Sequence, residues 1–167
     1  DIAMRRGGEQ LRPIQPILVD TYALIAEMFE NKGQIRGVPT GYTELDNMTT
    51  GLHGGEMILI AARPSMGKTA IGMNIVENAA IRCKKKAAVF SLEMPAEQLA
   101  LRMLCTEAKL DMQNVRRGRL EEEDWEKLSN AMTTINDAAI FVDATSGLSV
   151  AQIRSCLLYT SDAADDL

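Results

Sequence analysis

The feature that most restricts the fold is the loop Ala62-Arg63-Pro64-Ser65-Met66-Gly67-Lys68-Thr69. The residues that lead into it, 57–62, form a run that is apolar on both faces, as in a parallel strand buried from both sides. The pattern after the loop predicts a helix from Gly67 to about Cys83. A buried strand, a tight loop ending in Gly-Lys-Thr and a helix together form the context of a Walker A phosphate-binding loop.

Strands and helices alternate along the rest of the chain. Further buried strands are expected at residues 87–92 and 139–142, and a helix is expected after Pro95, which suits a first helical turn. A helix across residues 121–135 is predicted to bury Trp125, Leu128 and Met132. Ser149 and Gln152 form a capping-box signature for a last helix. The alternation predicts an α/β domain with a mostly parallel sheet flanked by helices.

An amphipathic helix from Pro16 to about Lys32 and Gly33 is predicted ahead of this domain, after an opening dozen residues that are typical of a linker. Its apolar stripe consists of Leu18, Tyr22, Ile25 and Phe29. From the residues alone, this stripe fits docking on a partner as well as packing on its own domain. Residues 1–36 are therefore assigned as a linker and a linker helix.

Each part of the phosphate-binding loop has a physical task. Gly67 lets the backbone approach a phosphate closely, and the backbone N–H groups from Ser65 through Met66 to Thr69 are expected to face inward. Lys68 supplies a cation for the phosphates, and the Thr69 hydroxyl suits Mg²⁺. The alternative is a tight strand-to-helix turn in an unrelated α/β protein. The predicted nucleotide-binding residues are Ser65, Met66, Gly67, Lys68, Thr69 and Ala70.

Glu93 follows the second predicted strand. Ligands of open parallel sheets sit beyond the carboxyl ends of the strands, which is where Glu93 is expected. A carboxylate there can orient and deprotonate an attacking water molecule. An acid that merely stabilises the start of the next helix is the alternative, and spacing does not choose between the two.

Charge and composition exclude several classes of protein. The net charge of −5 argues against strong autonomous DNA binding, which usually needs a basic face. No run reaches the 18 or so apolar residues of a membrane helix, and a signal peptide is not expected. Cys83, Cys105 and Cys156 lack the spacing of a zinc site or a disulfide framework, which favours a reducing cytoplasm.

Four segments together resemble DnaB-type replicative helicases. These are residues 36–46, the Gly-rich stretch 51–56, the loop 61–69 and residues 90–95. A Thr-Gly pair and a Walker A loop are shared by RecA-like ATPases, whereas Arg63–Thr69 and Ser91–Pro95 are the versions that single out this family. The family often has Ala where Ala62 stands.

The resemblance implies a RecA-like P-loop NTPase core that uses ATP and Mg²⁺. It implies that Lys68 and Thr69 contact phosphate and metal and that Glu93 is the catalytic glutamate that activates water. It also implies a cytoplasmic homo-hexamer in which the linker helix docks on a neighbouring subunit, with single-stranded DNA, primase and a helicase loader as partners of the parent protein.

The family pattern continues to about Ser155. We therefore expect residues 37–155 to be the N-terminal portion of the ATPase domain, truncated at its C-terminus, and residues 156–167 to be a tail unlike the family. Asp143 has the form of a Walker B aspartate, but in the family this stretch corresponds to an earlier strand. The DNA-binding loops and the arginine finger are expected beyond the chain, so very low hydrolysis is predicted for these residues alone.

Two other functions remain open from the sequence. One is a different RecA-like ATPase, such as a recombinase or a clock-type protein, although these generally lack the Ser91–Pro95 pattern. The other is a non-enzymatic interaction module whose linker helix docks on an intact ring.

Overall fold

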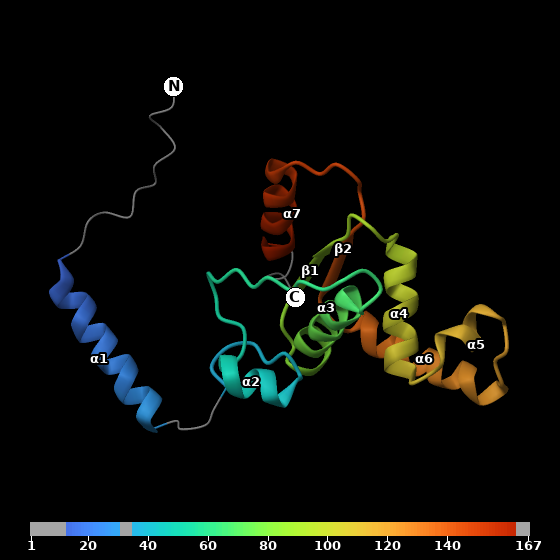
Figure 1. Ribbon diagram of the computed structural model, residues 1–167, viewed down its shortest axis with the longest axis horizontal. Helices are drawn as coiled ribbons and strands as arrows, with labels where there is room; N and C mark the ends of the chain where they lie inside the picture. The colour runs from blue at the N-terminus through green and yellow to red at the C-terminus, as the bar shows by residue number, and fades with distance from the viewer. Residues whose placement is uncertain (1–12, 31–34, 163–167) are drawn as a thin grey trace. The chain divides into compact units, whose positions relative to one another are not determined.

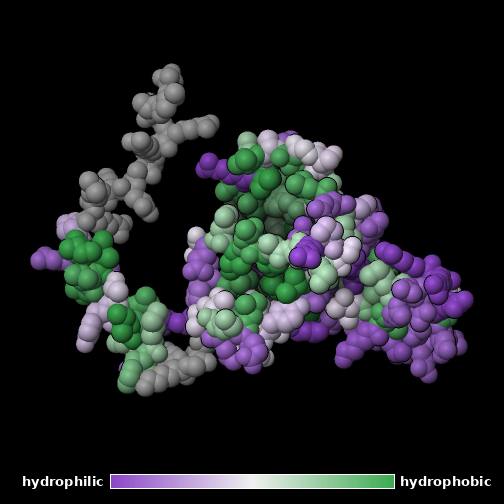
Figure 2. Space-filling view, in the orientation of Figure 1, coloured by the Kyte–Doolittle hydropathy of each residue, from purple (hydrophilic) through white to green (hydrophobic). Residues whose placement is uncertain are grey.

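The computed structural model describes residues 13–30 and 35–162, and the chain divides into two compact units, Asp1–Gln34 and Ile35–Leu167. In the first unit, helix α1 (Ile14–Glu30) confirms the predicted amphipathic helix. Its expected end at Lys32 and Gly33 lies outside the described residues. The predicted apolar stripe is exposed, and Figure 2 shows apolar side chains along this helix.

The second unit contains a small parallel sheet and helices around it (Figure 1). Strands β1 (Ala87–Phe90) and β2 (Ile140–Asp143) pair in parallel, with Ala87 opposite Ile140 and Phe90 opposite Asp143. The helical elements are α2 (Thr43–Thr49), α3 (Lys68–Glu77), the π-helical turn η1 (Asn78–Arg82), α4 (Ala96–Ala108), α5 (Met112–Arg116), α6 (Glu122–Asn136) and α7 (Val150–Asp162). The predicted parallel α/β arrangement is confirmed.

Helices α4 and α7 begin where the sequence predicts. Ser149 and Gln152 form the predicted capping box of α7, since Ser149 N–H donates to Gln152 Oε1 at 2.8 Å and Gln152 N–H donates to Ser149 Oγ at 3.3 Å. This box satisfies N–H groups that the helix itself leaves without partners. Helix α4 follows Pro95, as expected, without a side-chain cap.

The core of this unit is where α3, α4 and α6 meet the sheet. Met73, Leu99 and Met103 are buried there, with half-buried Val89 and Ile135 packed against them. Helix α3 is therefore fixed by its Met73 side, which orients the loop that precedes it.

The strand predicted over residues 57–62 does not form. These residues are neither helix nor strand, and Met57 and Leu59 are 92% and 84% exposed. An apolar run indicates that a segment is suited to burial, but a strand also needs a neighbouring backbone with which to exchange hydrogen bonds. In the described part of the chain, β1 and β2 pair with each other and not with this segment.

The predicted buried face of α6 is wrong at two positions. Trp125 and Met132 are 63% and 64% exposed, whereas Ala131 is 3% exposed and Ile135 contacts the core. The face of α6 that is buried is thus displaced by about one residue from the face that carries the large apolar side chains. Helix α6 packs against α4, and Ala131 is its most deeply buried residue.

A corner before α2 is held by a buried acid. Asp46, which is 3% exposed, accepts hydrogen bonds from Thr40 N–H at 2.8 Å, the Thr40 hydroxyl at 2.7 Å and Gly41 N–H at 3.2 Å. Burial alone would raise the pKa of Asp46, but these hydrogen bonds outweigh it and lower the pKa. The sequence analysis did not single out this structural role of Asp46.

Helix α7 continues through Cys156 to Asp162, so the domain boundary proposed at residue 156 does not coincide with the end of an element. A search of the described residues finds no helix long and apolar enough to span a membrane.

Candidate functional site

The loop before α3 has a backbone shape that few sequences adopt. Ser65 and Gly67 both have positive φ angles, 63° and 89°. Between them, Met66 N–H donates to Arg63 O at 3.2 Å, which closes a turn. Alternating backbone conformations of this kind form a concave nest of N–H groups that suits an anion.

The start of α3 adds further donors. Its first hydrogen bond runs from Ile71 N–H to Gly67 O at 3.0 Å, so the N–H groups of Lys68, Thr69 and Ala70 precede the helical ladder. Gly67, the N-cap residue, provides no side-chain cap to them. These donors and the positive end of the helix dipole point to an anion site.

This loop lines a cavity of about 550 Å³. The lining includes five of the six residues predicted to bind nucleotide, and it also includes the predicted catalytic Glu93. The members that come from the loop and the start of α3 are Ala62, Arg63, Pro64, Ser65, Gly67, Lys68, Thr69 and Ala70. Met66 is not part of this lining, and its side chain is 73% exposed. Its N–H donates to the Arg63 carbonyl oxygen within the turn.

Glu93 and Lys68 both line the cavity and form an ion pair. Lys68 Nζ is 3.6 Å from Glu93 Oε1, and the Lys68 and Glu93 side chains are 49% and 73% exposed. The segment that carries Glu93 is shaped by Ser91, whose hydroxyl donates to Met94 O at 2.8 Å and accepts from Met94 N–H at 3.1 Å. An exposed ion pair of this kind contributes little stability, so Lys68 is available to an incoming anion.

Arg102 is a cavity residue that the sequence analysis did not single out. It extends from α4 into the lining, and its Nε is buried without a hydrogen-bond partner among the described residues. A buried guanidinium nitrogen usually has an acceptor. No pattern in the sequence points to Arg102, because only the packing of α4 beside α3 brings it to the loop.

Asp143 is at the carboxyl end of β2, beside Phe90 of β1. Its Oδ1 accepts from Thr145 N–H at 2.8 Å, and hydrogen bonding to Thr145 lowers the pKa of Asp143. Asp143 lines a different cavity, next to Ser155 and Cys156, and is not part of the described lining of the loop cavity.

The parallel sheet, the nest before α3 and the lysine at its start define a P-loop α/β domain. The family model described as the DnaB-like helicase C terminal domain matches residues 37–163, and the chain belongs to this family.

Curated relatives agree with this assignment. The chain is 46% identical over 155 residues to the replicative DNA helicase DnaC of Bacillus subtilis (strain 168). It is 44% identical over 155 residues to the replicative DNA helicase DnaB of Geobacillus stearothermophilus. Each match covers 93% of this chain and 34% of the relative, so the chain spans about a third of these helicases.

Solved structures share the fold. The solved ATPase domain of another protein superposes with a TM-score of 0.84 at 35% identity, covering 92% of this chain and 54% of that one. A DnaB-like replicative helicase, studied for its interactions with primase, gives a TM-score of 0.78 at 35% identity, covering 92% of this chain and 36% of that one. The predicted RecA-like core is confirmed, and neither the recombinase or clock-type alternative nor the interaction module is favoured.

Proposed function

We propose that the cavity at the start of α3 binds ATP, and that these residues are part of the motor of a hexameric replicative DNA helicase that unwinds duplex DNA. One observation carries the proposal: the N–H groups of a nest, the Lys68 ammonium and the Glu93 carboxylate line a single cavity. For the 167 residues themselves, the proposed activity is nucleotide binding.

The donor set suits a triphosphate tail. The N–H groups of Lys68, Thr69 and Ala70 are hydrogen-bond donors, and the Lys68 ammonium lies beside them in an exposed ion pair with Glu93. A triphosphate provides the matching acceptors and negative charge. Ser65 and Gly67 shape the nest, and Met66 contributes to its turn rather than to contact with phosphate.

The residues also fit a magnesium ion held jointly with a nucleotide. The described residues contain no group of three or more acidic, His or Cys side chains that could hold a metal by themselves. Mg²⁺ commonly takes few protein ligands and completes its shell with phosphate oxygens and water. The Thr69 hydroxyl is the ligand that the cavity offers, and the ion supplies neutralisation of phosphate charge.

Glu93 is the proposed catalytic base. Arrival of a phosphate draws Lys68 away from Glu93, which leaves a carboxylate free to orient water and accept its proton. Arg102, from the α4 side, is proposed to hold the phosphates together with Lys68, since its buried Nε lacks an acceptor among the described residues.

Assembly and partners are proposed from the family. We propose a homo-hexamer in which α1 docks on a neighbouring subunit, and a cytoplasmic location. Single-stranded DNA, primase and a helicase loader are the proposed partners of the longer protein. The exposed apolar stripe of α1 supports the docking role.

Binding of a fluorescent ATP analogue to the 167-residue chain in Mg²⁺ buffer tests the proposal. We expect saturable binding that Lys68→Ala weakens about 30-fold or more, because a charge-assisted contact to phosphate is lost. Lys85→Ala, which removes an exposed lysine elsewhere, is the control and is expected to bind normally. Equal binding by the parent and Lys68→Ala would show that this loop is not the nucleotide site.

A further inference from the structure

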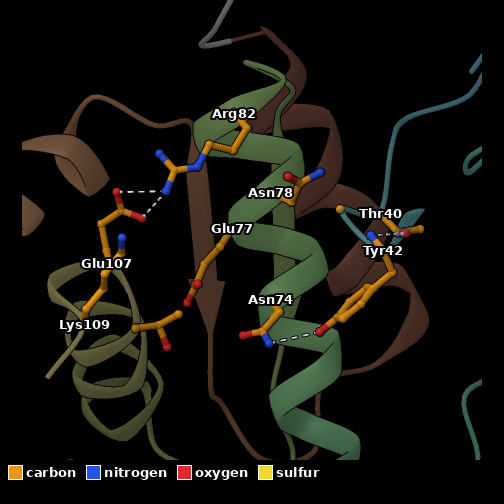
Figure 3. A pocket seen from close by; sticks show the side chains of 10 residues that line it. Thr40, Tyr42, Asn74, Glu77, Asn78, Arg82, Glu107 and Lys109 are labelled. Carbon is orange, nitrogen blue, oxygen red and sulfur yellow. Dashed lines mark hydrogen bonds and ion pairs between the residues drawn. The ribbon is translucent and has the colours of Figure 1, made fainter. Parts of the chain in front are cut away.

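A second cavity, of about 610 Å³, lies along the later turns of α3 (Figure 3). Its walls are the face of α3 and η1 that carries Asn74 and Glu77, the segment from Thr40 to Tyr42, and the end of α4 around Glu107. It shares no lining residue with the cavity at the P-loop. Part of its wall is the π-helical turn η1, a form that occurs frequently at functional sites.

Glu77 is a buried acidic residue in the lining of this cavity. It is 7% exposed, and its Oε1 is buried with no hydrogen-bond partner among the described residues. Its side chain points from α3 toward α4 (Figure 3). A buried carboxylate without a partner is costly, so the cavity as it stands lacks a donor for Glu77.

The neighbouring side chains of Asn74 and Asn78 use their amide nitrogens as hydrogen-bond donors within the protein. Asn74 Nδ2 donates to Tyr42 Oη at 3.0 Å, and Asn78 Nδ2 donates to the Pro39 carbonyl oxygen at 2.8 Å. The hydrogen bonds that the two nitrogens make fix which end of each amide is the oxygen. Asn74 and Glu77 are three residues apart and are neighbours on the surface of α3. Asn78 points instead toward the side of Thr40 and Tyr42, where its amide lies against Gly41 (Figure 3).

The other charged residues that line this cavity are Arg82, Glu107 and Lys109. Arg82 Nη2 holds Glu107 through both carboxylate oxygens, at 2.8 and 3.1 Å (Figure 3). Lys109 is exposed and forms no ion pair with Glu77. Burial, and then the charge of Glu107, raise the pKa of Glu77 to about 7 against an opposite effect of Arg82.

We propose that this cavity is a binding site for an ammonium or guanidinium group, which donates hydrogen bonds to Glu77 and to the amide oxygen of Asn74. The ligand is a cation because the unpartnered group is a carboxylate, and it is an N–H donor because both Glu77 Oε1 and the Asn74 oxygen are acceptors. A metal ion fits less well, since Glu107 is committed to Arg82 and one carboxylate remains.

The site does not depend on the proposed nucleotide binding. The cation is either a free amine or guanidine, or the Lys or Arg side chain of a second copy of this chain. The chemistry at Glu77 is the same for both.

The test uses the 167-residue chain labelled with ¹³C in its glutamate side chains, titrated with methylguanidinium chloride and followed by the carboxyl signal of Glu77. We expect a saturable change and a fall in the pKa of Glu77 by about 1 to 3, as an opposite charge nearby produces. Tetramethylammonium chloride at the same ionic strength has charge but no N–H, and is expected to give no saturable change.

Glu77→Gln identifies the Glu77 signal by removing it, and no remaining glutamate carboxyl signal of this variant is expected to change saturably. This variant is expected to fold, because glutamine has nearly the shape of the protonated acid. Glu126→Gln, which alters an exposed glutamate of α6, is the matched control and is expected to respond like the parent.

A series of protein concentrations without additive distinguishes the two sources of the cation. A pKa of Glu77 that falls as the concentration rises assigns the site to a side chain of another copy, and a constant value together with the methylguanidinium response assigns it to a free cation. An identical response to both salts, or a response retained in Glu77→Gln, overturns the proposal. So does a pKa of Glu77 that neither methylguanidinium nor protein concentration changes.

Discussion

The two cavities along α3 have opposite chemistry. At its N-terminal end the N–H groups of Lys68, Thr69 and Ala70 are donors, and the Lys68 ammonium beside them is held only by an exposed ion pair with Glu93. Toward its C-terminal end the acceptors are Glu77 Oε1 and the amide oxygen of Asn74. A helix dipole favours anions at its N-terminus and cations near its C-terminus, so both cavities follow the polarity of the helix that they share.

The cavities are also separated along the helix. Lys68 and Glu77 stand about 14 Å apart along the helix axis, at about 1.5 Å per residue. At physiological ionic strength the Debye length is about 8 Å, so the charges at one end have little direct effect on ligands at the other. Changes at each end are therefore expected to act separately.

The largest effect is expected from Asp46→Ala, which would break the wall of the Glu77 cavity. Burial of the Thr40 N–H and hydroxyl without their acceptor should lower the free energy of unfolding by about 4 kcal/mol at pH 7. Urea unfolding measures it, and Glu44→Ala, an exposed neighbour, should change stability by less than about 0.5 kcal/mol.

The pH dependence of this effect has a defined sign. The pKa of Asp46 is lowered in the folded state, so its contribution is present above its ordinary value of 3.8 and is lost as the pH falls below it through the folded pKa. The difference between parent and Asp46→Ala should therefore shrink in acid. A difference that grows toward low pH would contradict the role assigned to the ionised carboxylate.

Gly67→Val tests only the cavity at the N-terminal end of α3. A β-branched residue is strained at φ 89°, and its side chain would occupy space that opens onto the cavity. ATP affinity should fall about 100-fold, equivalent to about 2.7 kcal/mol, in a fluorescence titration. Gly72→Ala, a helical glycine with open space around it, should bind normally and be about 0.5 to 1 kcal/mol more stable. Weakened binding in both variants would point to general damage to α3.

Glu77→Gln tests only the cavity toward the C-terminal end of α3. Because the pKa of Glu77 is about 7 in the folded state and 4.5 ordinarily, the parent loses stability as the pH rises between these values. The variant should be about 2 kcal/mol more stable than the parent at pH 8 and nearly equal to it at pH 4.5, measured by urea unfolding. Its ATP affinity should match that of the parent, and a large change there would show that the two ends are coupled.

The smallest effect is expected from the ion pair between Arg82 and Glu107. A double-mutant cycle with Arg82→Gln and Glu107→Gln should give a coupling of about 0.5 to 1 kcal/mol, since Arg82 is largely exposed. Removing Arg82 alone should raise the pKa of Glu77 further, and removing Glu107 alone should lower it. Carboxyl NMR of Glu77 separates these outcomes.

The phosphate-binding loop before α3 could be predicted from sequence because its residues are consecutive. Gly67, Lys68 and Thr69 need only a helix behind them, and the pattern after the loop specifies that helix. Glu93 was harder, since its position depends on a strand that ends beside the loop. Arg102 and Glu77 could not be predicted, because each acquires its surroundings from the packing of α4 against α3.

The errors have similar causes. The apolar run 57–62 shows that burial suits those residues, but it does not specify a hydrogen-bonding neighbour. In α6, Trp125 and Met132 are larger than Ala131, and size suggested the wrong face. The contacts of α6 with α4 favour the small residue, and this preference is invisible in one sequence.

The π-helical turn η1 determines how a deletion would change the surface around Glu77. Each residue of an α-helix turns the chain by about 100°, so loss of one residue between Asn78 and Arg82 would rotate Arg82 by that angle while Lys68 and the loop before it stayed in place. Glu107 would then lose its guanidinium and become a second open acid beside Glu77. A single codon deletion is thus enough to change the charge of one end of α3 without altering the other.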